Sequence, residues 1–424
     1  MIRTNKTFYD FMTAFCWAFG MFASVCTRWR LSGVPVGAGE VILLLASVLT
    51  FIKYRASFWF SCLAGFLWSI LSIGFISQIV QKEIFPDAHR DWFSYTFCAL
   101  VVTAFYQFIR LKTRLMAKCT FYAALLSIAL LLLSLLSSIF GGNPWMYKEV
   151  PWVRFCGYSQ RITQVGLYLI PLVFLLGCFK RMMATNYLIL LTGVIVSLMT
   201  WAGTMALTFT FFTTCIVVLF FSLLWKIDRR KFIYVVLIAG LSHVVTINSV
   251  VYMNDGKFYS MDLFSQCRDK SEEGLVDRSP RRICFGQIEL SKSKSFKSDK
   301  DMRFTHWVNG IRAGITHPFI GLGPGLVSGY DGPFGGRSAH NSYVALFTAT
   351  GVFGAIIFFV WIFRISLSLF KSKNLWLIGV EFSILLYGCF SNYLRHPTFW
   401  MYLILCAVLG SKSVTADSKP ADNK

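Results

Sequence analysis

Residues 182–225 read MMATNYLILLTGVIVSLMTWAGTMALTFTFFTTCIVVLFFSLLW and contain no Asp, Glu, Lys or Arg. At about 1.5 Å per residue, one helix of this length would extend about 66 Å, roughly twice the thickness of a bilayer's hydrocarbon core. The segment must therefore turn back once. The turn is expected at Trp201-Ala202-Gly203-Thr204, because Gly is the flexible residue there. The stretch thus predicts two membrane-spanning helices, at about 183–202 and 205–225.

The rest of the chain has the same character. Of its 424 residues, 56% are hydrophobic and 14% are charged, whereas an ordinary soluble domain has about 25% charged residues. This composition excludes a soluble globular enzyme and a disordered chain. We expect an all-α polytopic membrane protein of about 12 transmembrane helices, the first of them an uncleaved signal-anchor. The twelve spans are predicted at about 11–27, 35–52, 58–79, 92–109, 120–140, 162–179, 183–202, 205–225, 232–252, 341–363, 375–391 and 397–411.

The charges give the predicted orientation. Lys and Arg number 41 and Asp and Glu 20, a formal net charge of +21. Sixteen basic residues fall in alternate short loops that contain few acids, and by the positive-inside rule these loops are cytoplasmic, as are both termini. Topology accounts for much of the surplus, so we expect no nucleic-acid partner. The basic residues of the predicted internal loops are Arg3, Lys6, Lys53, Arg55, Arg110, Lys112, Arg114, Lys118, Lys180, Arg181, Lys226, Arg229, Arg230, Lys231, Lys371 and Lys373.

This topology divides the chain into four parts. Residues 1–252 carry helices one to nine, 253–339 form one large external loop, 340–411 carry helices ten to twelve, and 412–424 form a cytoplasmic tail, with disorder expected after Gly410. Ten of the twelve Cys lie in or beside apolar spans or short loops and are expected to be small buried hydrophobes. Cys267 and Cys284 lie in the polar external loop, where an oxidising compartment favours a disulfide between them; two free thiols are the alternative.

The end of the external loop predicts an amphipathic helix. Its apolar residues recur at helical spacing and its polar residues fall on the other face, so we expect it to lie at the outer membrane-water interface and to end at Pro318. The apolar face consists of Phe304, Trp307, Val308, Ile311 and Ile315, and the polar face of Arg303, His306, Asn309 and Arg312.

A glycine-rich turn, Gly321-Leu322-Gly323-Pro324-Gly325, follows this helix. No strand precedes it and no Lys-Ser/Thr follows, which argues against a nucleotide-binding loop. We expect it to let the backbone bend close to the membrane surface. His340 then directly precedes the tenth predicted span, facing outside, and Ser338 or Asn341 is expected to cap that helix.

The order and spacing of these residues resemble the O-antigen ligase and polymerase superfamily. The pattern is an Arg, a Trp four residues later, a helix ending in Pro, a Gly-x-Gly-x-Gly turn, and His-Asn at the start of a span. The run from His340 through Gly351-Val352-Phe353-Gly354 is also similar to the span that follows that family's large loop. The matching residues are Arg303, Trp307, Pro318, Gly321, Gly323, Gly325, His340 and Asn341.

The resemblance implies a glycosyltransferase of the bacterial inner membrane that works on the periplasmic side. It implies a glycan on undecaprenyl pyrophosphate as donor and, for a ligase, a sugar hydroxyl of the lipid A-core as acceptor. Membrane lipids surround the protein, and no cofactor, nucleotide sugar or metal is expected.

Glycan transfer from a lipid pyrophosphate, which the resemblance implies, needs cations for the leaving group and a base for the acceptor hydroxyl. A pyrophosphate leaving group gains negative charge, which guanidinium groups bind well. Arg303 matches the family motif, Arg161 begins the sixth predicted span on the outside, and Arg312 and Arg337 are nearby alternatives. Each could instead anchor its segment to lipid headgroups. His340 is the candidate general base, since an imidazole accepts a proton at neutral pH; positioning the acceptor or the phosphate is its alternative role.

The chain departs from the family at one place. Many members carry a Ser-Arg-Gly-like element at the outer end of the span corresponding to the seventh here, where this sequence has Trp201-Ala202-Gly203-Thr204 and no Arg. Arg161 or Arg337 supplies that charge, or the donor binds differently. The one acid well inside a late span, Glu381, is expected to pair with a nearby cation such as Arg364.

Three functions are compatible with the sequence. An O-antigen ligase is favoured by chain length and the compact late loop. A polymerase would use the same donor and a lipid-linked glycan as acceptor. A transporter is disfavoured, because transporters show paired halves with broken helices and charges at the midplane, whereas these spans are almost free of charge.

Overall fold

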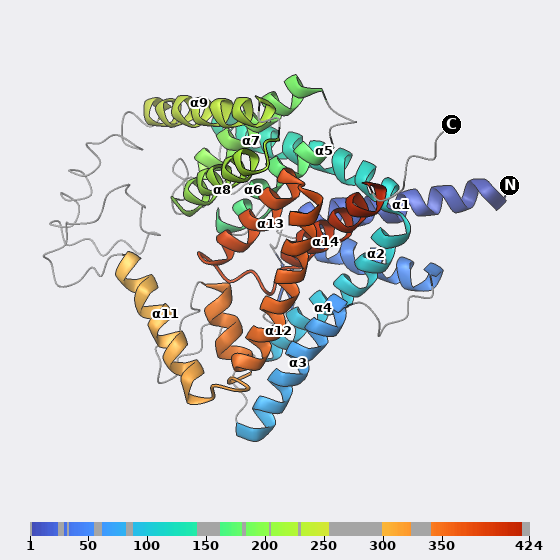
Figure 1. The fold of residues 1–424 in the computed structure, drawn as a ribbon, viewed down its shortest axis with the longest axis vertical. Helices are drawn as coiled ribbons and strands as arrows, with labels where there is room; N and C mark the ends of the chain where they lie inside the picture. The colour runs from blue at the N-terminus through green and yellow to red at the C-terminus, as the bar shows by residue number, and fades with distance from the viewer. Residues whose placement is uncertain are drawn as a thin grey trace, which may run out of the picture. The chain divides into compact units, whose positions relative to one another are not determined.

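The computed structural model describes residues 2–23, 29–31, 34–54, 62–81, 88–141, 162–179, 184–202, 205–227, 230–253, 299–323 and 341–417, and the fold is described for these residues. They form thirteen α-helices and one short hairpin, in which β1 (Trp29–Leu31) pairs antiparallel with β2 (Val34–Val36). The predicted all-helical class is confirmed for these ranges apart from the hairpin, which the sequence analysis did not anticipate (Figure 1).

Every predicted span overlaps a helix of the described ranges. The charge-free stretch divides as predicted, because α7 ends at Ala202 and α8 begins at Met205. These twelve helices are α1 (Ile2–Ala23), α2 (Ala38–Tyr54), α3 (Cys62–Gln81), α4 (Ala88–Leu111), α5 (Thr113–Gly141), α6 (Ile162–Cys178), α7 (Thr185–Ala202), α8 (Met205–Leu224), α9 (Arg230–Met253), α12 (Ser342–Ser372), α13 (Leu375–Gly388) and α14 (Pro397–Asp417).

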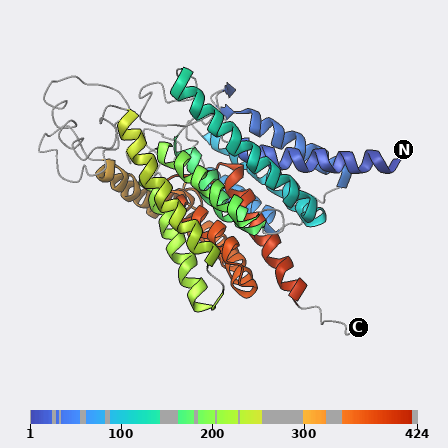
Figure 2. The same ribbon diagram turned by 90° about the horizontal axis from the view of Figure 1, so that it is seen from above.

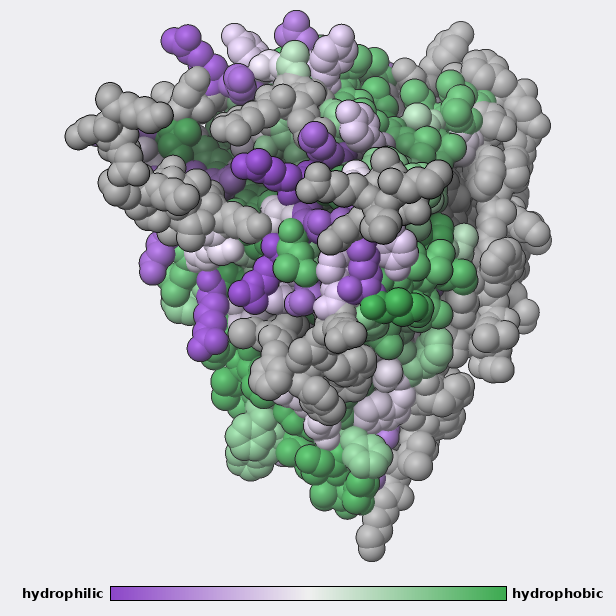
Figure 3. Space-filling view, turned by 90° about the vertical axis from the view of Figure 1, so that its right-hand side faces the viewer, coloured by the Kyte–Doolittle hydropathy of each residue, from purple (hydrophilic) through white to green (hydrophobic). Residues whose placement is uncertain are grey.

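Length and composition make several helices membrane-spanning. Within the described ranges, six helices are long and apolar enough to cross a bilayer: α4, α5, α7, α8, α9 and α12. Large apolar side chains stand exposed on them, such as Leu133 at 62%, Ile216 at 65% and Phe363 at 62%, and apolar residues cover wide areas of the face in Figure 3. A lipid environment explains this exposure. The number of crossings and their orientation stay predictions.

The chain forms two compact units. The first comprises residues 1–125 and 303–424. In it α1 packs on α2, and α14 packs against α4, α12 and α13 (Figure 1). Its core holds large fully buried side chains, among them Trp17, Trp400 and Tyr402. The second unit comprises residues 126–302, and in it α7 packs against α6 and α9, while α8 runs beside α9 (Figure 2).

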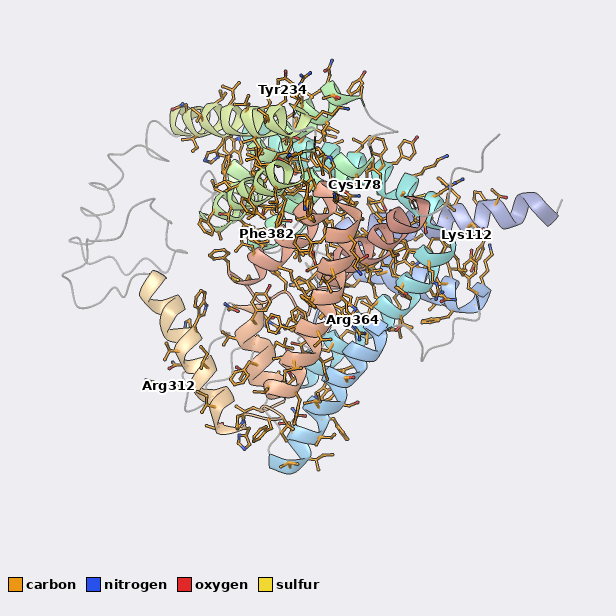
Figure 4. The ribbon with its side chains drawn as sticks, viewed as in Figure 1. Lys112, Cys178, Tyr234, Arg312, Arg364 and Phe382 are labelled. Atoms are coloured by element: carbon orange, nitrogen blue, oxygen red, sulfur yellow. The ribbon has the colours of Figure 1, made fainter. Side chains whose placement is uncertain are left out.

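An ion-pair cluster joins α1, α2 and Lys112, the residue between α4 and α5, at one end of the first unit. The Asp10 carboxylate binds the Lys53 ammonium and, at 2.7 Å, that of Lys112, and it accepts a hydrogen bond from the Tyr54 hydroxyl at 2.6 Å; Lys112 is labelled in Figure 4. Burial raises the pKa of Asp10, but the hydrogen bonds from Lys112, Lys53 and Tyr54 outweigh it and lower that pKa to about 2. The cations belong to predicted cytoplasmic loops, so the cluster ties α1 and α2 to the connection between α4 and α5.

Two predictions were wrong. Glu381 is buried and accepts a hydrogen bond from Ser366 Oγ at 2.9 Å, while Arg364 is exposed and forms no ion pair with it. Two residues apart on α12, Ser366 and Arg364 point about 200° apart, so only one can face α13. The tail is not irregular directly after Gly410 either, because α14 continues to Asp417.

Candidate functional site

The predicted amphipathic helix is present as α11 (Asp299–Thr316), which ends before Pro318. Arg303 and Arg312 both lie on it. Arg312 is exposed (Figure 4) and forms no ion pair in the described part of the chain. Ile311 and Ile315 are 42% and 60% exposed. An uncovered apolar edge beside the exposed Arg312 suits a helix at a membrane surface.

A different face of α11 contacts α12, and it is made of small residues. Thr348 Oγ1 donates to the carbonyl oxygen of Gly310 at 2.9 Å, and a Cβ added to Gly314 would meet the Phe347 ring at 2.5 Å. Gly310 and Gly314 form a Gly-x-x-x-Gly pair, which lets two helices approach closely. This spacing is visible in the sequence but was not among the predicted features.

Helix α12 is interrupted at Gly351. The backbone there has φ 63° and ψ −162°, a conformation outside the helical range that essentially only Gly adopts. The break separates a short first part, 342–350, from a second part, 352–372. At 1.5 Å per residue the second part extends about 31 Å, enough to cross a bilayer alone.

The turn at residues 318–323, which includes Gly321 and Gly323, fills this break. Leu322 N donates to Thr348 O at 2.8 Å and Gly323 N to Ala349 O at 2.9 Å. In the reverse direction, Val352 N donates to Pro318 O at 2.8 Å and Phe353 N to Phe319 O at 3.2 Å. The carbonyl and amide groups that the break would expose are thus satisfied by the turn. The turn therefore completes α12, and its expected bend close to the membrane surface stays a prediction.

Glycine is required at three positions of this joint. Gly321, Gly323 and Gly351 all have φ between 63° and 81°. A Cβ on Gly351 would lie 2.4 Å from the Phe319 carbonyl carbon, and one on Gly321 would lie 2.5 Å from Thr350 N. Both clashes are with backbone, which cannot move aside as a side chain can. Helix α3 adds a further contact, since Ser77 Oγ donates to Gly321 O.

The first residues of α12 are held from both sides. Asn341 caps the helix as predicted: its Oδ1 accepts from Tyr343 N at 2.9 Å and from Val344 N at 3.1 Å. Ser342 Oγ donates to Ser391 O at 2.8 Å and accepts from Tyr393 N at 3.0 Å. The chain position directly after His340 is therefore fixed by the cap and by the segment between α13 and α14.

That segment carries a cation that the sequence analysis missed. Arg395 Nη1 donates to Asp91 Oδ1 at 2.8 Å, and the Asp91 side chain is fully buried. The available signal was topology: the predicted orientation puts residues 391–396 outside, where a basic residue breaks the positive-inside pattern.

Two buried donors near this region lack a partner among the described residues, namely Trp307 Nε1 on α11 and Asn392 Nδ2 beside Tyr393. No group of three metal-ligating side chains occurs in the described ranges.

The other predicted site residues lie outside the described ranges. These are His340, Arg161, Arg337, Cys267 and Cys284, and the side chain of Arg303 is likewise not described. What the structure does bring together is α11, which carries Arg303 and Arg312, and α12, which follows His340.

Comparison with known proteins gives a family match for part of the chain. No curated protein matches the chain. Residues 187–359 match the family model described as O-Antigen ligase. This stretch begins in α7, includes α11 and ends in α12, eight residues after the break at Gly351. It includes the motif positions from Arg303 to Asn341. The family consists of glycosyltransferase-like enzymes that act on lipid-linked glycans. The predicted similarity to O-antigen ligases is therefore confirmed over residues 187–359, in a chain whose apolar helices are those of a multi-pass membrane protein.

Proposed function

We propose that this protein is an O-antigen ligase that transfers a glycan from undecaprenyl pyrophosphate to a sugar hydroxyl of the lipid A-core. The observation that carries the proposal is the family match at residues 187–359. The joint between the 318–323 turn and α12 supports it, because this joint holds the arginine-bearing helix against the helix that follows His340.

The reaction in this proposal is one direct displacement. The acceptor oxygen forms a bond to the anomeric carbon while the bond from that carbon to the phosphate oxygen breaks, and the pyrophosphate leaves with the electron pair. His340 takes the acceptor's proton, so configuration at the anomeric carbon inverts. A neutral imidazole suits this role, since the ordinary pKa of His is about 6.5.

The arginines stabilise the leaving group. Arg303 is the first candidate, and Arg312, exposed on the same helix and without an ion pair among the described residues, is the second. Arg161 and Arg337 complete the set. Guanidinium groups stay protonated and bind phosphate oxygens in a bidentate manner, so no metal is needed to neutralise the charge. By the positive-inside pattern the site faces the periplasm and both termini face the cytoplasm of the bacterial inner membrane.

Substitution of His340 tests the base. We expect His340→Ala to lower the rate of glycan transfer about 100-fold to 10,000-fold, the usual contribution of a general base, at unchanged protein level. His317→Ala is the matched control, because the contact of that ring within the described residues is to the adjacent Thr316, with Nδ1 at 3.0 Å from Oγ1. Transfer is measured in membranes from a deletion strain that carries each variant. Wild-type transfer by His340→Ala would remove His340 from the mechanism.

Substitution of Arg303 tests the leaving-group site. We expect Arg303→Ala to reduce transfer by at least tenfold, because one charge-assisted contact to phosphate contributes about 1.5–3 kcal/mol. Arg303→Lys should retain part of the activity. Arg364→Gln is the control, since Arg364 is an exposed arginine of α12 and no part of this site. Normal transfer by Arg303→Ala at normal expression would contradict the assignment.

The deletion strain separates a ligase from a polymerase. Loss of a ligase leaves polymerised glycan on its lipid carrier and lipid A-core without glycan. Loss of a polymerase leaves single repeats attached to the core, and that outcome would replace the acceptor in the proposal by a second lipid-linked glycan.

A further inference from the structure

The segment between α13 and α14, residues 389–396, is tied to its surroundings by a buried ion pair. Arg395 Nη1 lies 2.8 Å from Asp91 Oδ1 in the first turn of α4. The Asp91 side chain is 0% exposed and the Arg395 side chain 22% exposed. A carboxylate without solvent is costly unless a cation and hydrogen bonds compensate it. The pair therefore fixes Arg395 to α4 with a directional, charge-assisted contact.

The same segment is bonded to the start of α12. Tyr393 N donates to Ser342 Oγ at 3.0 Å, and Ser342 Oγ donates to Ser391 O at 2.8 Å. Trp400 Nε1 of α14 donates to Leu394 O at 2.8 Å. A short chain of contacts thus runs from Asp91 through Arg395 and Tyr393 to Ser342. Ser342 is the first residue of α12 and follows the Asn341 cap.

We propose that Asp91 and Arg395 act as a positioning pair for glycan transfer, by fixing the segment that holds the first turn of α12. The inference rests on the proposed function, because it concerns the same site. Neither residue touches the substrate in this scheme. Their effect passes through Ser342 to the chain position of His340, where a small displacement of a base lowers the chemical rate more than it weakens substrate binding.

The test is a kinetic comparison at the pair. Asp91→Asn, Arg395→Gln, Arg395→Lys and the Asp91→Asn/Arg395→Gln double variant are purified in detergent and assayed with the lipid-linked glycan and with lipid A-core. We expect Asp91→Asn and Arg395→Gln each to lower kcat at least tenfold with KM for the donor within twofold of wild type. Arg395→Lys should recover kcat to within about threefold, and the double variant should be no worse than either single one.

Three outcomes would overturn the inference. A lowered melting temperature with unchanged kcat per folded molecule would make the pair a stabilising contact only. A raised donor KM for Arg395→Gln, with Asp91→Asn unaffected, would make Arg395 a phosphate ligand. Single effects that multiply in the double variant would show that the two residues do not act together.

A second variant serves if the charged residues do not tolerate substitution. Ser342→Ala removes both hydrogen bonds to the segment without unpairing a buried charge, and it should also lower kcat at least tenfold; an unchanged kcat would contradict the inference. Arg364→Gln is again the control expected to match wild type. Each preparation is read for core-linked glycan and for lengthened lipid-linked glycan. Wild-type protein that makes only the second product contradicts the ligase proposal but still reports on the pair.

Discussion

Two helix joints of this protein are built in opposite ways. Helices α7 and α9 of the second unit meet through side chains: Thr200 Oγ1 lies 2.8 Å from His243 Nδ1, and Thr246 Oγ1 donates to Ser197 Oγ at 2.9 Å. In the first unit, the turn after α11 meets α12 through four backbone hydrogen bonds at an interrupted helix. Side-chain contacts of the first kind can be exchanged one at a time. The backbone contacts exist only while residue 351 keeps a conformation reserved for glycine.

The largest effect is expected at the glycine joint. Gly351→Ala brings a Cβ to 2.4 Å from the Phe319 carbonyl carbon at a positive φ, and we expect it to destabilise the protein by about 3 kcal/mol or more and to abolish transfer. Gly240→Ala on α9 is the matched control, since no atom lies within 4 Å of its added Cβ, and helix propensity favours Ala there. Melting temperature and glycan transfer are measured together. A stable, active Gly351→Ala would show that α12 does not need the break.

A smaller loss of stability is expected at the ion-pair cluster around Asp10. Asp10→Asn leaves Lys53 and Lys112 without their carboxylate, and we expect a loss of about 2 kcal/mol, between the values for exposed and buried pairs. The sign with pH follows from the pKa of Asp10, which folding lowers to about 2. The stabilisation is complete above about pH 4 and disappears as pH falls towards 2. Melting curves from pH 7 to 2.5 should show wild type and Asp10→Asn converging in acid. A constant difference would contradict the assignment.

The smallest effect is expected between α7 and α9. Thr246→Val removes the hydroxyl that donates to Ser197, and hydrogen bonds between membrane helices contribute about 0.6 kcal/mol on average. Thr246→Ser keeps the hydroxyl and should match wild type. Transfer should be normal in both variants. A loss as large as that of Gly351→Ala would remove the distinction between the two joints.

The sequence predicted the features that depend on local composition, and it did not predict the features that depend on a partner segment elsewhere in the chain. Among the described residues, hydropathy and charge patterning placed a helix at each predicted span, the division between α7 and α8, and the amphipathic helix, because each depends on local composition. The Asn341 cap was predictable for the same reason. The break at Gly351 was not, since its apolar neighbours continue a helical pattern and only the partner turn makes an interruption favourable.

Ion pairs between residues far apart in the chain could not be predicted from the sequence either. Asp91 and Arg395 are 304 positions apart, and nothing in either local segment indicates the other. Glu381 shows the opposite error. A buried acid suggested a cation, but the structure satisfies it with Ser366, because the α12 face turned towards α13 carries that hydroxyl and not Arg364.

The break in α12 allows two complete sets of bonds for the same groups. With Gly351 in a helical conformation, Val352 N and Phe353 N would bond to Thr348 O and Ala349 O, four residues earlier, as in any helix. In the structure these four groups bond instead to the turn at residues 318–323. An insertion of this kind replaces two bonds within α12 by four bonds to another segment. If the turn withdrew, these four groups of α12 could bond to one another, and none would lose its hydrogen bond. The position of the turn and the straightness of α12 are therefore coupled, because the same four groups bond either to the turn or within the helix.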